Sequence, residues 1–354
     1  MRPAATEPWL QRAWTRRGVP ACLLAPLALC FGILVALRRA LYRTGLLRST
    51  RVGRPVVVVG NLVAGGAGKT PLTLALIDAL RAAGHTPGVI SRGHGGSASA
   101  AGALLPAATD APDPARYGDE PCLIRRKTGA PVAMGRDRVA AARRLIAAHP
   151  EVDVLIADDG LQHYALARDV ELAVFDARGA GNGWLLPAGP LREPLTRLAM
   201  VDAVVCNGAA NATLLRRLPG GIPRFTMSVA PRAAWQLIAP ENRRPLSDWR
   251  DARIQALAGI GVPQRFFDTL AAAGLRSTNL ALPDHYAFPA GDNGAAELFD
   301  AAADVILITE KDAVKCLGRS DLADPRVWVV EVAATLDAGL VESILEKLRG
   351  STTA

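Results

Sequence analysis

Cysteine is scarce in this chain of 354 residues, and the five that are present form no CxxC pair. Two of them, Cys22 and Cys30, lie in an apolar run near the N-terminus, and the other three are scattered. Disulfide frameworks and structural zinc sites need closely spaced cysteines, the latter often with histidines. The sequence therefore argues against both classes and favours a reducing compartment.

Acidic residues and lysine are almost missing from residues 1–54, which hold ten arginines, no lysine and one acid, Glu7. This segment carries a charge of +9, and because the whole chain carries +8, the remaining 300 residues sum to −1. The basic excess is thus confined to the N-terminus. We therefore expect no nucleic-acid partner, although the overall pI is high.

Charge of either sign is absent from residues 18–37, a stretch of 20 residues. A helix of this length spans about 30 Å, the thickness of the hydrocarbon core of a bilayer. Arginine pairs flank the stretch, and no small-residue cleavage site follows it, which disfavours a signal peptide. Residues 1–50 are predicted to form a membrane anchor, either inserted or lying in the interface, with the body of the chain on the cytoplasmic side.

A glycine-rich turn follows the four valines at 56–59 and ends in a Lys-Thr pair, where a helical pattern begins. Strand, glycine loop and helix form the phosphate-binding arrangement of a P-loop, in which backbone N–H groups and the helix N-terminus face the phosphates. The threonine hydroxyl is a ligand for Mg²⁺. The predicted ATP-binding residues are Gly65, Gly66, Ala67, Gly68, Lys69 and Thr70.

The spacing of this loop is unusual, because Val63 stands where the common pattern has its first glycine, and Gly60 is the outer glycine instead. A chance glycine-rich turn is the alternative. The valine strand before the loop and the helix after it favour nucleotide binding.

A second apolar strand, at residues 152–157, ends in Asp158 and Asp159. In P-loop enzymes an acid at a neighbouring strand end completes the metal site. Aspartate also commonly starts turns, so both interpretations remain open. With a P-loop about ninety residues earlier, both aspartates are candidate Mg²⁺ ligands, and adjacency alone does not decide between them.

Strands alternate with helices from residue 51 to 222, which predicts a P-loop NTPase-type, doubly wound parallel sheet of the α/β class. A long loop is expected at 94–118. Two short strands, at 224–229 and 234–238, predict a two-stranded connector over 223–245. A second, smaller α/β domain is expected over 246–354, with helices near 263–273, 295–303 and 338–348.

Six short motifs occur in a fixed order behind the apolar N-terminal segment: GNLVAGGAGKTP, YGDEP, ADDGLQH, LLPAGPLREP, DHYAF and ITEKDAVK. This ordered set resembles the tetraacyldisaccharide 4′-kinases, the lipid A 4′-kinases of Gram-negative bacteria, and the resemblance covers nearly the whole chain. It also accounts for the unusual P-loop, because the family's loop carries the same extra residues. A tyrosine is expected where this chain has His94.

The resemblance implies ATP-dependent phosphorylation of the 4′-hydroxyl of a tetraacyldisaccharide 1-phosphate, which gives lipid IVA. It also implies Mg²⁺, the inner membrane and contact with membrane lipid, and we expect a monomer. By the family pattern Asp119 is the catalytic base and His285 pairs with it. Further motif positions near the active site are Lys69, Arg192, Gln162, His163 and the candidate metal ligand Glu120.

Two other functions are compatible with a P-loop in this sequence. A membrane-associated nucleotide switch would bind partners without phosphorylating a substrate, but such proteins often have a lysine where this chain has Ala64. A soluble P-loop kinase for a small molecule is disfavoured by the apolar N-terminal segment.

Overall fold

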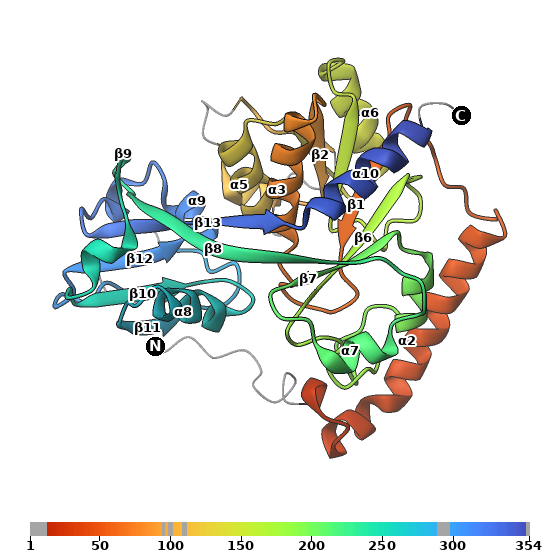
Figure 1. Cartoon of the computed structure of the whole chain (residues 1–354), viewed down its shortest axis with the longest axis horizontal. Helices are drawn as coiled ribbons and strands as arrows, with labels where there is room; N and C mark the ends of the chain where they lie inside the picture. Colours follow the sequence, from red (N-terminus) through yellow and green to blue (C-terminus); the bar gives the residue numbers. More distant parts are fainter. Residues whose placement is uncertain (1–12, 94–95, 98–101, 108–111, 289–297, 352–354) are drawn as a thin grey trace.

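The computed structural model describes residues 13–93, 96–97, 102–107, 112–288 and 298–351. Its strands form one 13-stranded sheet in the order β11-β10-β12-β13-β8-β7-β6-β1-β5-β2-β4-β3, with β9 paired to β8. Two lobes are visible along this sheet, joined by the long strands β8 and β13 (Figure 1). We call them the P-loop half and the C-terminal half.

The P-loop half contains the predicted parallel sheet, in which β1 lies between β5 and β6. The carboxyl ends of these three strands therefore meet at one edge, where a doubly wound sheet binds ligands. The parallel strands are β1 (Val56–Gly60), β2 (Pro87–Ser91), β4 (Val132–Met134), β5 (Val154–Asp158), β6 (Val170–Asp176) and β7 (Ala203–Asn207). The short strand β3 (Ala103–Leu104) pairs antiparallel with β4 at the edge of the sheet.

Both faces of this sheet are covered, which explains the uninterrupted run of valines in β1. Val57 and Val59 belong to the core beneath α3, α5 and α10, whereas Val56 and Val58 belong to the core beneath α6 and α7. The helices are α3 (Lys69–Ala82), α5 (Asp119–Thr128), α6 (Arg138–Ala148), α7 (Ala212–Arg217) and α10 (Ala338–Ser351).

The C-terminal half is built on three parallel strands and the first part of β13, which extends the same parallel set. Its elements are η4 (Leu246–Trp249), β10 (Ile254–Ala258), α8 (Pro263–Ala272), β11 (Ser277–Ala281), β12 (Val305–Thr309), α9 (Glu310–Cys316), η5 (Ser320–Leu322) and β13 (Val327–Leu336).

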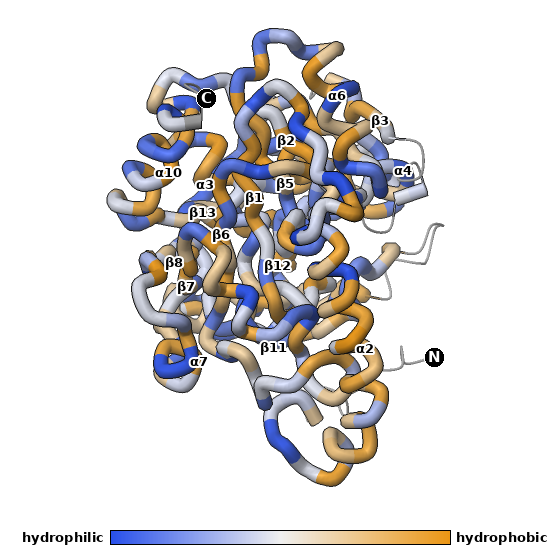
Figure 2. Tube along the Cα trace, turned by 90° about the vertical axis from the view of Figure 1, so that its right-hand side faces the viewer, coloured by the Kyte–Doolittle hydropathy of each residue, from blue (hydrophilic) through white to orange (hydrophobic). Residues whose placement is uncertain are grey.

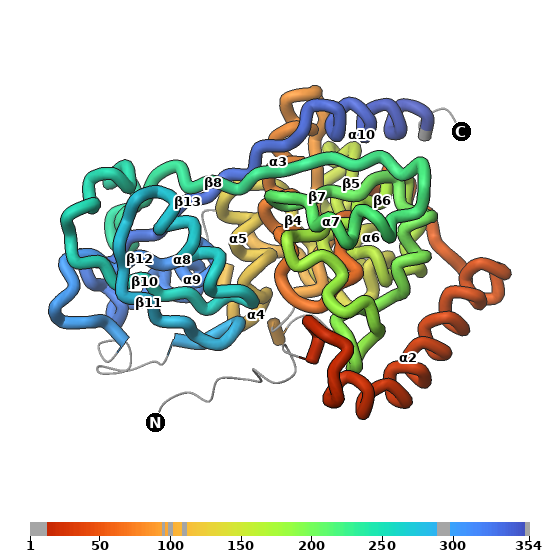
Figure 3. The backbone as a smooth tube through the Cα atoms, turned by 60° about the horizontal axis from the view of Figure 1, so that its bottom comes forward, coloured from red at the N-terminus to blue at the C-terminus, as the bar shows by residue number. Residues whose placement is uncertain are grey.

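The connector differs from the prediction in the bounds of its strands, because β8 (Arg224–Gln236) runs unbroken through residues 230–233 and crosses both halves (Figure 3). It pairs antiparallel with β13, and with β9 (Ala239–Arg244) at its end. The register of β8 and β13 shifts between Glu331 and Val332, where Pro231 lies opposite. A β-bulge tolerates the missing N–H of proline, so the strand continues.

Three smaller expectations also need correction. The last helix, α10, packs against α3 in the core of the P-loop half rather than in the C-terminal domain. The expected loop at 94–118 contains β3 and α4 (Pro114–Tyr117), and parts of it lie outside the described residues. Residues 298–303 form turns, not a helix, and the rest of the helix expected at 295–303 is not described.

The apolar N-terminal segment is the helix α2 (Val19–Arg43), which lies along the P-loop half and stands out in Figure 2 as a hydrophobic stretch. Ala21 and Ala28 are buried against the body of the protein. The outer face is exposed and apolar. Within the described part of the chain, α2 alone is long and apolar enough to cross a membrane. Its exposed residues include Val19, Leu23, Leu27, Leu29, Ile33, Leu34 and Leu37.

Candidate active site

The P-loop connects β1 to α3, and its conformation depends on two glycines with positive φ, Gly65 and Gly68. A side chain at Gly68 would collide with Asn207, whose amide nitrogen lies 3.3 Å from the carbonyl oxygen of Ala67. The Asn61 side chain donates to the carbonyls of Val63 and Gly65, at 2.6 and 3.0 Å. The loop between β1 and α3 is thus held by two asparagines, Asn61 after β1 and Asn207 at the end of β7.

Lys69 is the first residue of α3, and its ammonium group lies 3.3 Å from Asn61 Oδ1 and 3.3 Å from Asp159 Oδ1. Thr70 follows in the first turn of the same helix. The predicted phosphate-binding residues therefore lie together at the carboxyl edge of the sheet, at a helix N-terminus that favours anions.

The adjacent acids Asp158 and Asp159 have opposite environments. Asp158, the last residue of β5, is buried and accepts a hydrogen bond from Thr73 at 3.2 Å. Burial, reinforced by the charge of Glu120, raises the pKa of Asp158 to about 7. For Asp159 burial is outweighed by the charges of Lys69 and Arg192, which lower its pKa to about 2.

Asp119 begins α5 and is contacted from the C-terminal half. His285 Nδ1 lies 3.1 Å from Asp119 Oδ2, and the Lys315 ammonium lies 3.8 Å from the same oxygen. Burial opposes ionisation, but the hydrogen bond with His285 and the charge of Lys315 outweigh it and lower the pKa of Asp119. The structure thus joins the predicted base and histidine into one pair, with an ionised carboxylate.

The next residue, Glu120, makes a second contact between the halves. Lys311 of α9 lies 3.3 Å from Glu120 and 3.4 Å from Asp284. Buried Asp312 holds the start of α9, because it bonds to the backbone N–H of Gly259 at 2.9 Å and to Lys315 at 2.7 Å.

The remaining predicted residues lie around these groups. Arg192 donates to both oxygens of Asp159, at 3.0 and 3.2 Å. Gln162 donates to the carbonyl of Asn61 and to Glu193, both at 3.3 Å. Burial and the neighbouring charge of Arg138 lower the pKa of His163 to about 4, so this imidazole is neutral near pH 7. His94 is outside the described residues.

Comparison with known proteins decides the family. The sequence model of the family described as tetraacyldisaccharide-1-P 4′-kinase matches residues 20–349. The chain belongs to this 4′-kinase family. It is 51% identical to the tetraacyldisaccharide 4′-kinase of Janthinobacterium sp. (strain Marseille), over 98% of both chains. It is 50% identical to the enzyme of that name from Herminiimonas arsenicoxydans, over 100% of this chain and 99% of the relative.

A solved structure supports the P-loop kinase fold. The crystal structure of the "apo" form of LpxK from Aquifex aeolicus, in complex with ATP, superimposes with a TM-score of 0.75. The match covers 93% of this chain and 100% of that one, at 24% sequence identity.

A kinase of this family uses a nucleotide, whose phosphate charge is commonly neutralised by a divalent metal ion. No group of three or more His, Cys, Asp or Glu side chains in the described ranges is arranged to hold one. Mg²⁺, however, usually keeps several waters and takes one or two carboxylates plus substrate phosphates. Asp158 Oδ2 is buried without a hydrogen-bond partner, as expected of an oxygen that a cation or its water would satisfy. The residues present fit Mg²⁺.

Three charged residues that contact one another beside the P-loop were not singled out from the sequence. Asp176 ends β6 beside the P-loop and pairs with Arg178 at 2.7 Å. Arg178 also donates to the carbonyl of Gly66 at 2.8 Å. Arg265 of α8 forms an ion pair with Asp176 and lies 3.3 Å from the Gly66 carbonyl, so it reaches the loop from the C-terminal half. Asp176 had the same strand-end signal as Asp158, whereas Arg265 had none.

Proposed function

We propose that this chain transfers the γ-phosphate of ATP to the 4′-hydroxyl of a tetraacyldisaccharide 1-phosphate, giving lipid IVA and ADP. Membership of the 4′-kinase family supports the substrate. The observation that carries the chemistry is the pairing of Asp119 with His285 across the two halves. Positioned carboxylates of this kind accept protons from attacking hydroxyl groups.

In this mechanism the 4′-oxygen attacks the γ-phosphorus, the bond to the β–γ bridging oxygen breaks, and Asp119 accepts the hydroxyl proton. His285 orients the carboxylate. Lys69 and Arg192 stabilise the negative charge of the phosphates, because both are within ion-pair distance of Asp159 and are held there before substrate arrives.

Thr70 and Asp158 would hold Mg²⁺, which when bound neutralises charge on the β- and γ-phosphates. Asp158 is the better candidate for the metal ligand, because one of its oxygens has no hydrogen-bond partner. The oxygens of Asp159 already bond to Lys69 and Arg192. The metal roles predicted for Asp159 and Glu120 stay predictions.

We further propose that α2 places the enzyme, as a monomer, on the cytoplasmic side of the inner membrane. The exposed leucines of α2 suit contact with lipid acyl chains. The arginines around the helix suit anionic headgroups. A lipid substrate can then keep its acyl chains in the membrane while its sugar reaches the site.

The test is phosphate transfer by the purified full chain in detergent micelles, with Mg²⁺, labelled ATP and the disaccharide 1-phosphate. Labelled product is expected only when the lipid is present. A nucleotide switch would instead hydrolyse ATP without labelling the lipid, and that result would contradict the proposal. The family match gives no support to the switch.

A further inference from the structure

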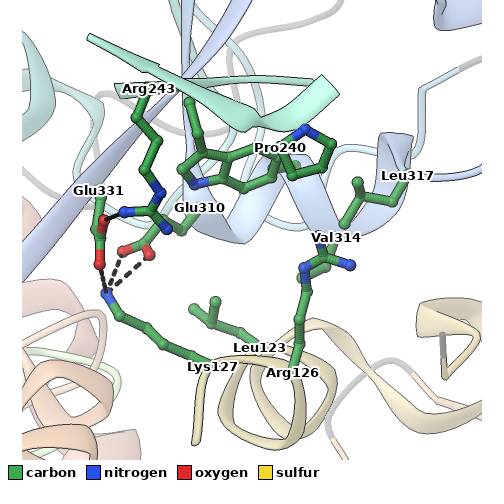
Figure 4. A pocket seen from close by; sticks show the side chains of 11 residues that line it. Leu123, Arg126, Lys127, Pro240, Arg243, Glu310, Val314, Leu317 and Glu331 are labelled. Carbon is green, nitrogen blue, oxygen red and sulfur yellow. Dashed lines mark hydrogen bonds and ion pairs between the residues drawn. The ribbon is translucent and has the colours of Figure 1, made fainter. Parts of the chain in front are cut away.

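Apart from the contacts at Asp119 and Glu120, the two halves also meet at a groove of about 380 Å³ between α5, α9, β9 and β13 (Figure 4). Lys127, in the last turn of α5, points across this groove. Its ammonium group lies 2.8 and 3.0 Å from the two carboxylate oxygens of Glu310, the first residue of α9. Both side chains are largely buried, so this ion pair is shielded from solvent.

The same pair bonds to the backbone of β13 at the bulge. Lys127 donates to the carbonyl of Val332 at 2.7 Å, and the Val332 N–H donates to Glu310 at 3.2 Å. The residue opposite, Pro231, has no N–H to offer. The strand that connects the halves is therefore held, where its register changes, by side chains from both halves.

The helices that this pair joins also bear groups of the active site. Asp119 and Glu120 lie in the first turn of α5, about 12 Å from Lys127 at 1.5 Å per residue. Lys311 and Lys315 of α9 contact these two acids. Because helices are stiff over two or three turns, the contact at Lys127 sets how α9 approaches Asp119.

We propose that Lys127 is a positioning residue for phosphoryl transfer, which holds the halves in the arrangement where α9 and His285 reach Asp119. This inference rests on the proposed function. It makes Lys127 important for kcat and not for ATP affinity, since the residue lies at the opposite end of α5 from Asp119 and contacts Glu310 and Val332. The chemical step is sensitive to such placement, and a displacement of about 1 Å can lower a rate about a hundredfold.

Arg243 provides a matched control. It pairs with Glu331 at 2.7 Å beside the same groove. Glu331 also lies 3.9 Å from the Lys127 ammonium, but the bond between Arg243 and Glu331 stays on the β9–β13 side and does not itself join α5 to α9. A variant at Arg243 therefore removes a neighbouring ion pair without releasing α5 from α9.

The experiment compares Lys127→Met, Lys127→Arg and Arg243→Met in the full chain, measuring kcat, the KM for ATP, and hydrogen exchange over residues 327–336. Lys127→Met should lower kcat about ten- to a hundredfold, leave the KM for ATP within about twofold, and speed exchange at the bulge. Lys127→Arg should retain most of the wild-type kcat. Arg243→Met should change neither kcat nor the rate of hydrogen exchange at the bulge.

The proposal is overturned if Lys127→Met retains wild-type kcat and exchange, or if Arg243→Met matches it. Should Lys127→Met fold poorly because Glu310 is left buried and unpaired, the double variant Lys127→Met/Glu310→Gln removes that charge and must show the same loss of kcat. If the wild type itself labels no lipid, the proposed function fails. Hydrogen exchange at the bulge then tests separately whether Lys127 holds the two halves together.

Discussion

The two halves of the sheet contribute to the site in different ways. In the P-loop half, the groups expected to bind nucleotide stand on neighbouring strand ends and on the first turn of α3, and they bond to one another. The C-terminal half contributes side chains that reach across a boundary: His285 from a loop, Lys311 and Lys315 from α9, and Arg265 from α8.

This difference separates nucleotide binding from completion of the site. Groups on one rigid sheet are held in place before ligand arrives, whereas groups from the second half depend on how the halves are placed. A kinase built this way can bind ATP on one half and bring His285 to Asp119 only when the other half closes. This order limits ATP hydrolysis by water.

The largest effect is expected from Asp119→Ala, which removes the group that both halves share. Turnover should fall about 10²–10⁴-fold because no carboxylate accepts the proton, while ATP affinity stays within about twofold. Steady-state kinetics and equilibrium ATP binding measure the two quantities. An equal loss of ATP affinity would contradict the division between the halves.

Lys69→Ala tests the P-loop half alone. Turnover should fall about 10²–10³-fold and ATP should bind more weakly, because the lysine contributes to both ground-state binding and charge stabilisation. The same kinetic and binding measurements apply. Unchanged ATP affinity would show that Lys69 is not a phosphate ligand.

Arg265→Ala and Arg178→Ala compare a contact between the halves with one inside the P-loop half. Both arginines bond to Asp176 and to the Gly66 carbonyl. We expect Arg265→Ala to lower kcat about three- to tenfold, and Arg178→Ala to raise the KM for ATP by a similar factor, since both pairs are partly exposed. Identical effects on both parameters would remove the distinction.

The smallest effect concerns stability and pH. The pKa of Asp159 is about 2 in the folded state, below its ordinary value of 3.8, so its ion pairs stabilise the fold above about pH 4 and lose this contribution as the pH falls to 2. Asp159→Asn should cost about 1–2 kcal/mol of unfolding free energy at pH 6 and much less near pH 2.5. Urea denaturation at both values measures this, and a pH-independent difference would contradict it.

Much of the P-loop half was predictable, because its signals are local. The valine run and the Lys-Thr pair are contiguous, and Asp158 directly follows an apolar strand. The different environments of Asp158 and Asp159 were not predictable. They depend on Thr73 and Arg192, which are distant in sequence and are brought close by the sheet.

The connector shows where local reasoning failed. The run around Pro231 suggested a break between two strands, yet pairing with β13 carries β8 through it by means of a bulge. Cross-strand pairing with β13 outweighed the local preference of one proline. Similarly, α10 was assigned to the C-terminal domain by order along the chain, but its apolar face packs on α3.

The sequence by itself determined the nucleotide loop, the parallel sheet and the apolar helix, because hydrophobic periodicity and glycine conformation act over a few residues. The family resemblance implied the pairing of His285 with Asp119, and the tertiary structure gave its geometry. Only the tertiary structure decided that Lys315 meets Asp119, that Arg265 reaches the P-loop, and that Lys127 bonds to the bulge. Asp119 and His285 are 166 residues apart, and no local preference determines a contact over that distance. It is set by the packing of two halves on one continuous sheet.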